Sequence, residues 1–163
     1  MEEKTIQRRV FAIALAVLAV SASLSAAPGS YDQWVGTWVY NYDKSTHDEE
    51  SATKMTRKFE AVGNDGMKFT RDAISAHGET QHSEYIVNFD GKDYHAVGET
   101  SGGTQAYRRI YSNTLECISK SPNGNSLKQV MVLAKDGKSF VLTETGKYGN
   151  GKTANHYSVF EKQ

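Results

Sequence analysis

In several short segments after residue 34, hydrophobic side chains recur at every second position, as in strands that bury one face. Met55 and Phe59 share one parity, whereas the other parity of that segment carries Lys, Thr and Glu. Tyr85, Val87 and Phe89 alternate in the same way. Short runs rich in Val, Thr, Tyr and Phe are typical of β-strands. The pattern therefore predicts an all-β domain.

Turn signals divide this region into short segments. Asp90-Gly91, Asn123-Gly124 and Asp136-Gly137 carry residue pairs that favour the positive φ angles of tight hairpins. The strands predicted between such turns span residues 34–42, 53–62, 67–76, 80–89, 93–98, 105–111, 114–120, 127–135, 139–146 and 153–161. Strands joined by short loops favour an antiparallel meander, and closing the meander removes its two exposed edges. We therefore predict an antiparallel up-and-down β-barrel of roughly 8–10 strands, with a two-sheet sandwich as the alternative.

The start of the chain has a different composition. Lys4, Arg8 and Arg9 precede an uncharged apolar run of 11 residues at 10–20, which small residues follow at 21–27. This order is typical of a cleavable secretory signal. The apolar run is shorter than the roughly 20 residues that span a bilayer, which argues against the alternative of a membrane anchor.

Residues 1–26 are therefore predicted to form a signal-peptide helix, and residues 27–163 a single β-barrel domain. Cleavage is expected after Ser25 or Ala26, which gives a secreted or periplasmic bacterial protein without a stable membrane anchor. The Arg-Arg-x-Phe spacing that begins at Arg8 leaves the twin-arginine export route open.

The charge balance and the cysteine content limit which partners and which covalent links we expect. The 19 basic and 19 acidic residues of the chain balance, and residues 27–163 retain 16 and 17 of them. This near-neutral balance gives no electrostatic reason to expect nucleic acid as a partner. Cys117 is the only cysteine, so the chain cannot form an internal disulfide. Because Cys117 shares parity with Leu115, we expect a buried structural thiol.

Two end motifs carry a family resemblance. Gly36-Thr37-Trp38 resembles the Gly-x-Trp motif of the calycin superfamily, which includes lipocalins and fatty-acid-binding proteins. The final segment, from Ser158 to Lys162, resembles the last strand of fatty-acid-binding proteins. The chain is also similar to uncharacterised small exported bacterial lipocalin-like proteins. The resemblance implies a ligand-binding barrel in which Gly36 bends the first strand and Trp38 plugs the barrel floor.

Two departures argue against a fatty-acid carrier of the usual kind. The Arg-x-Tyr clamp that fatty-acid-binding proteins carry in the last strand is replaced by Ser158 and Phe160, and residues 43–52 are too few for their two-helix lid.

We therefore predict a binding protein that holds a small hydrophobic or amphipathic ligand inside the barrel. Arg57 and Arg71 share parity with apolar neighbours, and an inward guanidinium needs an anionic partner or a water-filled mouth; a rim position for both is the alternative. The candidate ligand-binding residues are Trp38, Arg57, Phe59, Phe69, Arg71, Tyr85, His156 and Phe160.

His156 shares parity with Phe160, so it could act as a general base or ligate haem, although no cofactor or metal is the primary expectation. A barrel filled by its own aromatics, with no ligand, is a further alternative. Trp34 is expected to cap the barrel from outside, and the inward face of residues 107–111 is not assigned.

Overall fold

The computed structural model of the chain describes residues 31–47, 51–97 and 102–163, so the predicted signal segment lies outside the described residues. The strands are β1 (Gly36–Asn41), β2 (Lys54–Val62), β3 (Gly66–Ile74), β4 (Thr80–Asn88), β5 (Tyr94–His95), β6 (Thr104–Tyr111), β7 (Thr114–Lys120), β8 (Ser126–Leu133), β9 (Ser139–Lys147) and β10 (Thr153–Lys162). No helix long and apolar enough to cross a membrane occurs within these three described ranges.

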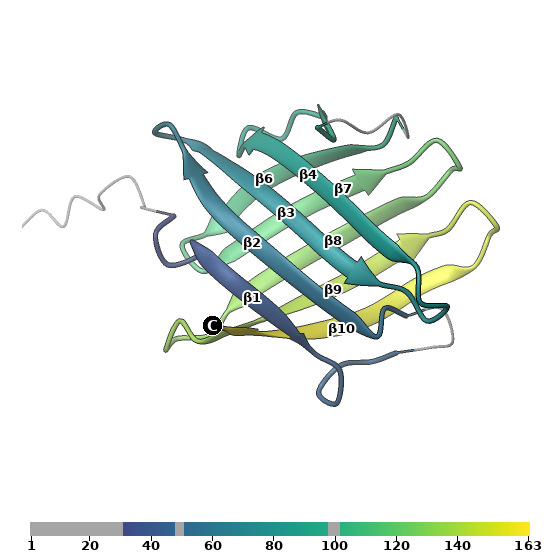
Figure 1. Cartoon of the computed structure of the whole chain (residues 1–163). Coiled ribbons are helices and arrows are strands. Elements are labelled where there is room, and N and C mark those ends of the chain that lie inside the picture. The colour runs from purple at the N-terminus through teal and green to yellow at the C-terminus, as the bar shows by residue number, and fades with distance from the viewer. Residues whose placement is uncertain (1–30, 48–50, 98–101) are drawn as a thin grey trace, which may run out of the picture.

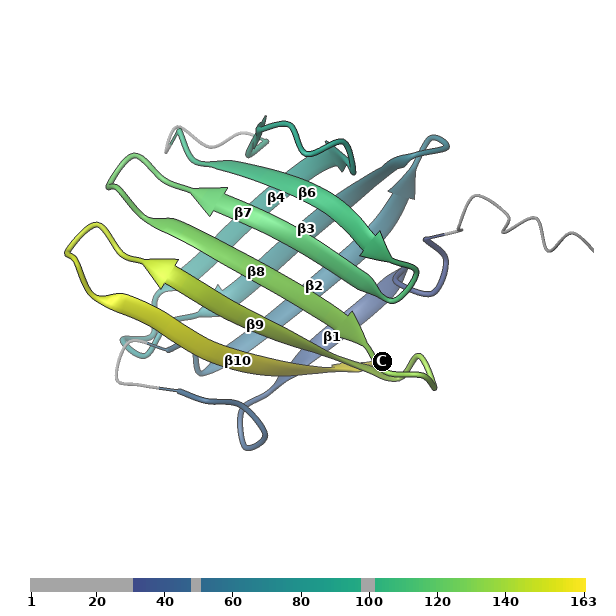
Figure 2. The same ribbon diagram turned by 180° about the vertical axis from the view of Figure 1, so that it is seen from behind.

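The ten strands form one antiparallel sheet in the order β4-β3-β2-β1-β10-β9-β8-β7-β6-β5. The first strand pairs with the last, so the sheet folds back on itself. Figures 1 and 2 show the result from two sides: β1–β4 form one wall and β6–β10 form the wall that faces it. The predicted all-β antiparallel barrel is confirmed, and the sandwich alternative is wrong because all strands belong to one sheet.

The barrel is nearly closed. No strand pairing joins β4 to β5 among the described residues. Instead, the backbone N–H of Val97 donates to the carbonyl oxygen of Glu84 over 2.7 Å. The barrel is therefore closed between β4 and the segment around β5 by fewer backbone hydrogen bonds than join its paired strands.

One predicted strand is much shorter than expected. The segment 93–98 contributes only Tyr94 and His95 as β5. The chain is already attached to β6 at Asp90, which bridges to Arg108, and Gly91 then turns with φ +74°. This turn leaves only a short stretch to pair again with β6.

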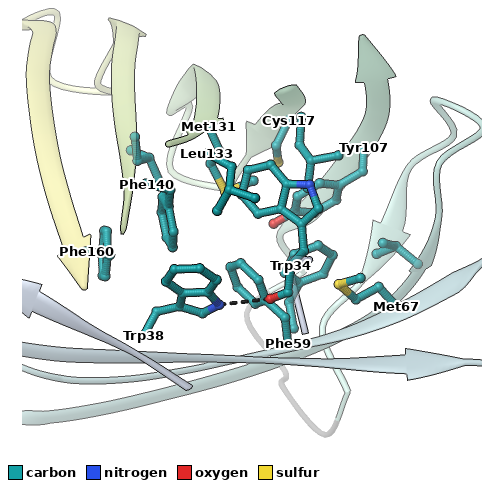
Figure 3. Close-up of a cluster of buried hydrophobic side chains, with 14 of the residues drawn as sticks. Trp34, Trp38, Phe59, Met67, Tyr107, Cys117, Met131, Leu133, Phe140 and Phe160 are labelled. Carbon is teal, nitrogen blue, oxygen red and sulfur yellow. Dashed lines mark hydrogen bonds between the residues drawn. The ribbon is translucent and has the colours of Figure 1, made fainter. Parts of the chain in front are cut away.

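Aromatic side chains fill one end of the barrel (Figure 3). The indoles of Trp34 and Trp38 are completely buried, and Trp38 Nε1 donates to the carbonyl oxygen of Trp34 over 2.9 Å. The ring of Trp38 meets Phe140 edge-on, with 5.1 Å between ring centroids. Trp38 therefore occupies the floor position that the Gly-x-Trp resemblance implies.

Trp34 corrects the expectation of an outside cap. The backbone N–H of Trp34 donates to Tyr31 over 2.8 Å in a turn that precedes β1. This turn carries the chain across the end of the barrel, and the indole enters the core between Phe59 and Phe140.

The predicted inward parity is confirmed on both walls. Phe59, Phe69 and Val87 are buried on β2, β3 and β4, and Cys117 and Met131 are buried on β7 and β8. Their outward neighbours are exposed or partly exposed: those on β2 and β3 are polar, whereas those on the other strands include apolar residues such as Ile86 and Val132. The core therefore runs around the inside of the sheet.

The floor aromatics predict a large stability effect. Trp38→Ala should lower the free energy of unfolding by about 3–5 kcal/mol, because it leaves a cavity beside Phe140. Tyr111→Ala, at a side chain 68% exposed, is the control and should change it by less than about 0.5 kcal/mol. Urea unfolding followed by circular dichroism measures both. Equal midpoints for Trp38→Ala and the unsubstituted protein would contradict the assignment of Trp38 to the floor.

Candidate ligand-binding site

A cavity of about 990 Å³ lies inside the barrel, next to the aromatic floor. Side chains from both walls line it, including Phe59 and Tyr85 from one wall and Leu142 and Phe160 from the other. Turn residues such as Asn123 and Asn150 line its other end. The cavity is therefore a cup, plugged at the floor and bordered by loops at the mouth.

The deep part of the cup is aromatic. Phe59 and Phe69 meet edge-on with 4.7 Å between centroids, and Phe69 stacks on Tyr107 from the other wall at 4.4 Å. Phe160 stacks on Phe140 of the floor at 4.7 Å. These rings give the cavity a rigid apolar surface of the kind that lines small-molecule binding sites.

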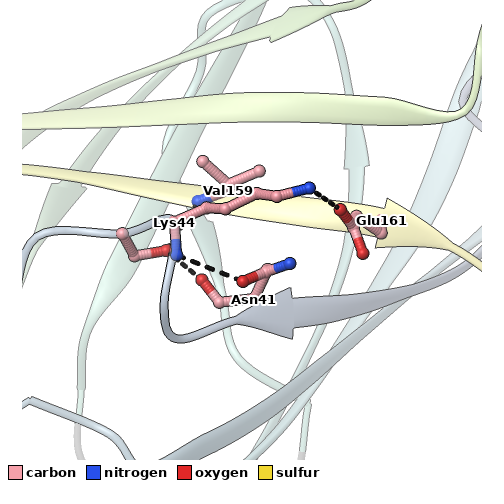
Figure 4. Close-up of polar contacts among 5 residues, drawn as sticks. Asn41, Lys44, Val159 and Glu161 are labelled. Carbon is pink, nitrogen blue, oxygen red and sulfur yellow. Dashed lines mark hydrogen bonds and ion pairs between the residues drawn. The ribbon is translucent and has the colours of Figure 1, made fainter.

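One loop at the mouth is fixed to the end of the last strand (Figure 4). Lys44 Nζ forms an ion pair of 2.7 Å with Glu161, and the backbone N–H of Lys44 donates to Asn41 Oδ1 over 3.1 Å. The hydroxyl of buried Ser45 accepts from the backbone N–H of Val159 over 2.9 Å. These contacts hold the chain after β1 against β10, where Thr46 lines the cavity.

A cationic row follows the first wall. Arg57 of β2 lies directly opposite Arg71 of β3, which lies opposite Ser83 of β4, and all three line the cavity. The Arg57 guanidinium carbon lies 5.4 Å from the centroid of the Phe160 ring. Arg57 Nε is buried and has no hydrogen-bonding partner among the described residues. Arg71 Nη1 donates to Gln81 over 3.2 Å. Arg57 Nε is therefore shielded from solvent, while the rim position of the two guanidinium groups stays an alternative prediction.

A second polar row follows the facing wall. Gln129, Glu144 and His156 lie side by side in register on β8, β9 and β10, and all line the cavity. Gln129 is 7% exposed, and its Nε2 donates to Glu144 Oε2 over 2.7 Å. The hydroxyl of Tyr148 donates to the other oxygen of Glu144 over 3.4 Å. The cavity therefore has polar groups on two opposed walls above an aromatic base.

Cys117 of β7 and Tyr107 of β6 continue this second row beyond Gln129, because each lies opposite the previous one in register. Burial raises the pKa of the Cys117 thiol from its ordinary value of 9.0 to about 12, and burial raises the pKa of Tyr107 well above its ordinary value. The positive charge of Arg57 lowers the pKa of both groups to a smaller extent. Arg57 and Tyr107 line the same cavity.

The structure brings most of the predicted site residues together. The cavity is lined by Arg57, Phe59, Phe69, Arg71, Tyr85, His156 and Phe160. Trp38 is not among the residues that line it, because its indole is enclosed by the floor aromatics. The cavity lining therefore gives no support to ligand contact by Trp38, which stays a prediction.

Sequence reasoning missed Gln129 and Glu144. Gln129 has the parity of Met131, and Glu144 has the parity of Leu142. The signal that could have identified them is a polar residue at an inward-facing strand position, which is the signal that identified Arg57.

The other four histidines do not line the cavity. His82 Nδ1, for example, lies 2.6 Å from Asp72 Oδ1 on the exposed face. Within the described part of the chain, no three His, Cys, Asp or Glu side chains come together in a way that could hold a metal ion.

No family model and no curated protein matches this chain. Solved structures do match. The wild-type fluorescent protein UnaG is similar with a TM-score of 0.58 and 13% identity, and the match covers 82% of this chain and 100% of UnaG. A UnaG mutant gives 0.57 and 14%, with 82% and 99% covered. A redesigned β-barrel, mFAP1 bound to DFHBI, gives 0.47 and 12%, with 82% and 99% covered.

The matches to UnaG, at low identity and nearly full coverage, define the fold. The chain therefore shares the β-barrel fold of UnaG, in agreement with the barrel that the end motifs led us to expect.

The buried thiol predicts a particular reactivity. Iodoacetamide should modify native Cys117 at least 100-fold more slowly than the unfolded chain at pH 8, because only an accessible thiolate reacts. Raising the pH from 7 to 10 should speed the reaction of the unfolded chain through its ordinary pKa. The native rate should stay low, since the pKa of the folded thiol is about 12. Intact-mass spectrometry counts the single adduct, and equal native and unfolded rates would contradict the burial.

Proposed function

We propose that this protein is an exported, lipocalin-like binding protein that holds a small, largely apolar ligand inside its barrel. The observation that carries the proposal is the cup of about 990 Å³ above the aromatic floor. This volume lies at the upper end of the roughly 300–1,000 Å³ of small-molecule sites. Apolar ligand surface that enters it gains about 25 cal/mol for each Å² removed from water.

The charges in the cavity favour an amphipathic ligand with an anionic end. The described residues that line the cavity include three cationic side chains, those of Arg57, Arg71 and Lys152, but only one carboxylate, that of Glu144. A guanidinium inside a barrel is costly unless an anion or water pairs with it. A carboxylate or phosphate on the ligand would supply that charge, while the rest of the ligand contacts the aromatic rings.

The alternatives differ in their support. A barrel filled solid by its own aromatics does not fit a cavity of this size. Catalysis or haem ligation by His156 stays a prediction, to which the geometry adds only that His156 lies opposite Glu144 in register.

If the cavity binds ligands, a side chain that occupies the cavity should weaken the binding of a fluorescent dye. The anionic apolar dye 1-anilinonaphthalene-8-sulfonate should bind the purified protein with enhanced fluorescence, and hexadecanoate should displace it. Ser158→Trp places a large ring in the cavity and should weaken dye binding at least tenfold. Tyr157→Trp, at the exposed neighbour on the same strand, should leave it unchanged.

Two results would overturn this proposal. One is the absence of saturable dye binding by the unsubstituted protein. The other is identical binding by Ser158→Trp and Tyr157→Trp. As an independent measurement, denaturing extraction of natively purified protein followed by mass spectrometry identifies any small molecule that co-purifies.

The exported location rests on the pattern of residues 1–26. Full-length chain produced in a bacterial host should appear in the periplasm or medium with 25 or 26 residues removed, as measured by intact mass. Replacing Arg8 and Arg9 by lysine should stop export only if the twin-arginine route is used. Recovery of the intact chain in the cytosol would contradict the proposal.

A further inference from the structure

We infer that the mouth of the cup is a binding subsite for an oxyanion at the outer end of the ligand: a carboxylate, a sulfonate or a phosphate. Four side chains that line the cavity form this subsite, which we call the donor collar: Asn123, Asn125, Asn150 and Lys152. The inference rests on the proposed function and gives its ligand a direction, with the anionic end at the mouth and the apolar end against the aromatic rings.

The collar belongs to two hairpin loops that touch each other. Residues 121–125 join β7 to β8, residues 148–152 join β9 to β10, and Figures 1 and 2 show both loops at the same end of the barrel. The backbone N–H of Gly149 donates to Asn125 Oδ1 over 2.8 Å. A Cβ atom on Gly149 would lie only 1.7 Å from the carbonyl oxygen of Asn123. The two loops are therefore in direct contact, which holds the collar residues at one mouth.

Turn hydrogen bonds fix the orientation of the three carboxamides. The backbone N–H of Asn125 donates to Asn123 Oδ1 over 3.3 Å, and that of Lys152 donates to Asn150 Oδ1 over 3.0 Å. Asn125 Oδ1 accepts from Gly149 in the same way. Because a backbone N–H only donates, the oxygen of each carboxamide is the atom engaged by the loops. The three NH₂ groups remain as donors, and none has a hydrogen-bonding partner among the described residues.

Lys152 adds a positive charge to these donors. Its side chain is exposed and forms no ion pair within the ranges that the structure describes. Glu144, the one carboxylate among the described lining residues, accepts hydrogen bonds from Gln129 and Tyr148 instead. The collar thus combines N–H donors with an unpaired positive charge, and an oxyanion is the acceptor that such a group binds most strongly.

Accessibility distinguishes the collar from the arginines deeper in the cup. Lys152 and two of the three asparagines are exposed, and the third asparagine is half-buried, so a ligand can reach their donors. Arg57, in contrast, lies over the Phe160 ring at 5.4 Å, and its Nε is buried. An oxyanion in the collar still lies in the cavity that Arg57 and Arg71 line, so its charge offsets theirs from the mouth.

A matched pair of dyes tests the inference. 1-Anilinonaphthalene-8-sulfonate and N-phenyl-1-naphthylamine share one ring system and differ only in the sulfonate. Fluorescence titration gives the Kd of each, and the ratio of the two values measures how strongly a variant prefers the oxyanion. Dodecanoate and dodecyl phosphate, each compared with dodecan-1-ol by displacement of N-phenyl-1-naphthylamine, repeat the comparison for the other two oxyanions.

Substitution of the asparagines removes donors without removing turn contacts. Asn123→Asp and Asn150→Asp each keep the oxygen that accepts from the backbone and replace the NH₂ group by a second acceptor. Each should lower the preference for the sulfonate at least tenfold. Asn155→Asp adds the same charge at an exposed position of β10 that does not line the cavity, and should change the preference less than threefold.

Substitution of the lysine tests the positive charge in the same way. Lys152→Met should lower the preference at least fivefold, whereas Lys147→Met, which removes an exposed charge of β9 outside the cavity lining, should change it less than threefold. Changes below threefold in Lys152→Met and in both asparagine variants would overturn the inference. Equal effects of the collar variants and their controls would also overturn it, because net charge alone would then explain the preference.

The two proposals fail in distinguishable ways. If neither dye binds the unsubstituted protein, the binding function itself is wrong. If both dyes bind and every collar variant keeps the preference of the unsubstituted protein, binding stands and only the collar is wrong. Thermal melting shows which variants fold, and because three collar positions are substituted separately, those that fold decide the matter.

Discussion

The pairing of β1 with β10 is the constraint on which the site depends. Four residues of each strand lie in register, from Trp38 opposite Lys162 to Asn41 opposite Val159. This ladder joins a wall made from the first half of the domain to a wall made from the second half. Arg57 and Gln129 are 72 positions apart in the chain, yet they face one space because those walls are closed against each other. A sheet left open between β1 and β10 would have the same strands and no cup.

The interior divides into a part that stabilises the fold and a part that leaves polar groups unsatisfied. At the floor, the rings of Trp34, Trp38 and Phe140 pack without exposure to solvent. Above them, Arg57 and Gln129 keep buried atoms without partners, which is unfavourable for folding. Such local conflicts between burial and hydrogen bonding are expected at functional sites. The favourable packing of the aromatic floor offsets the unfavourable contribution of these atoms to the free energy of folding.

Much of the fold was predictable because its signals are local. Asp-Gly and Asn-Gly turns mark strand ends, and alternation along β2, β3 and β8 shows which side chains enter the core. The exception, β5, depends on how Asp90 pairs with a distant strand, which alternation does not report. The inward placement of Arg57 followed from parity in the same way as that of Phe59.

The facing polar row was harder to predict. Gln129 and Glu144 are ordinary surface residues by type, and their meaning comes from register across β8 and β9. Register between strands joined by a hairpin is inferable in principle, but the opposition of that row to Arg57 depends on barrel closure. The inward position of Trp34 likewise depends on a turn at Tyr31 that precedes the first strand. In each case the missing information was non-local.

The solitary cysteine has a consequence for where and when this domain can mature. With one thiol and no possible internal cross-link, the barrel acquires its full stability from packing and pairing alone. Its folding therefore requires neither an oxidant nor a disulfide isomerase, and its stability does not change with the redox potential of the surroundings. The same barrel can form in a reducing or an oxidising compartment.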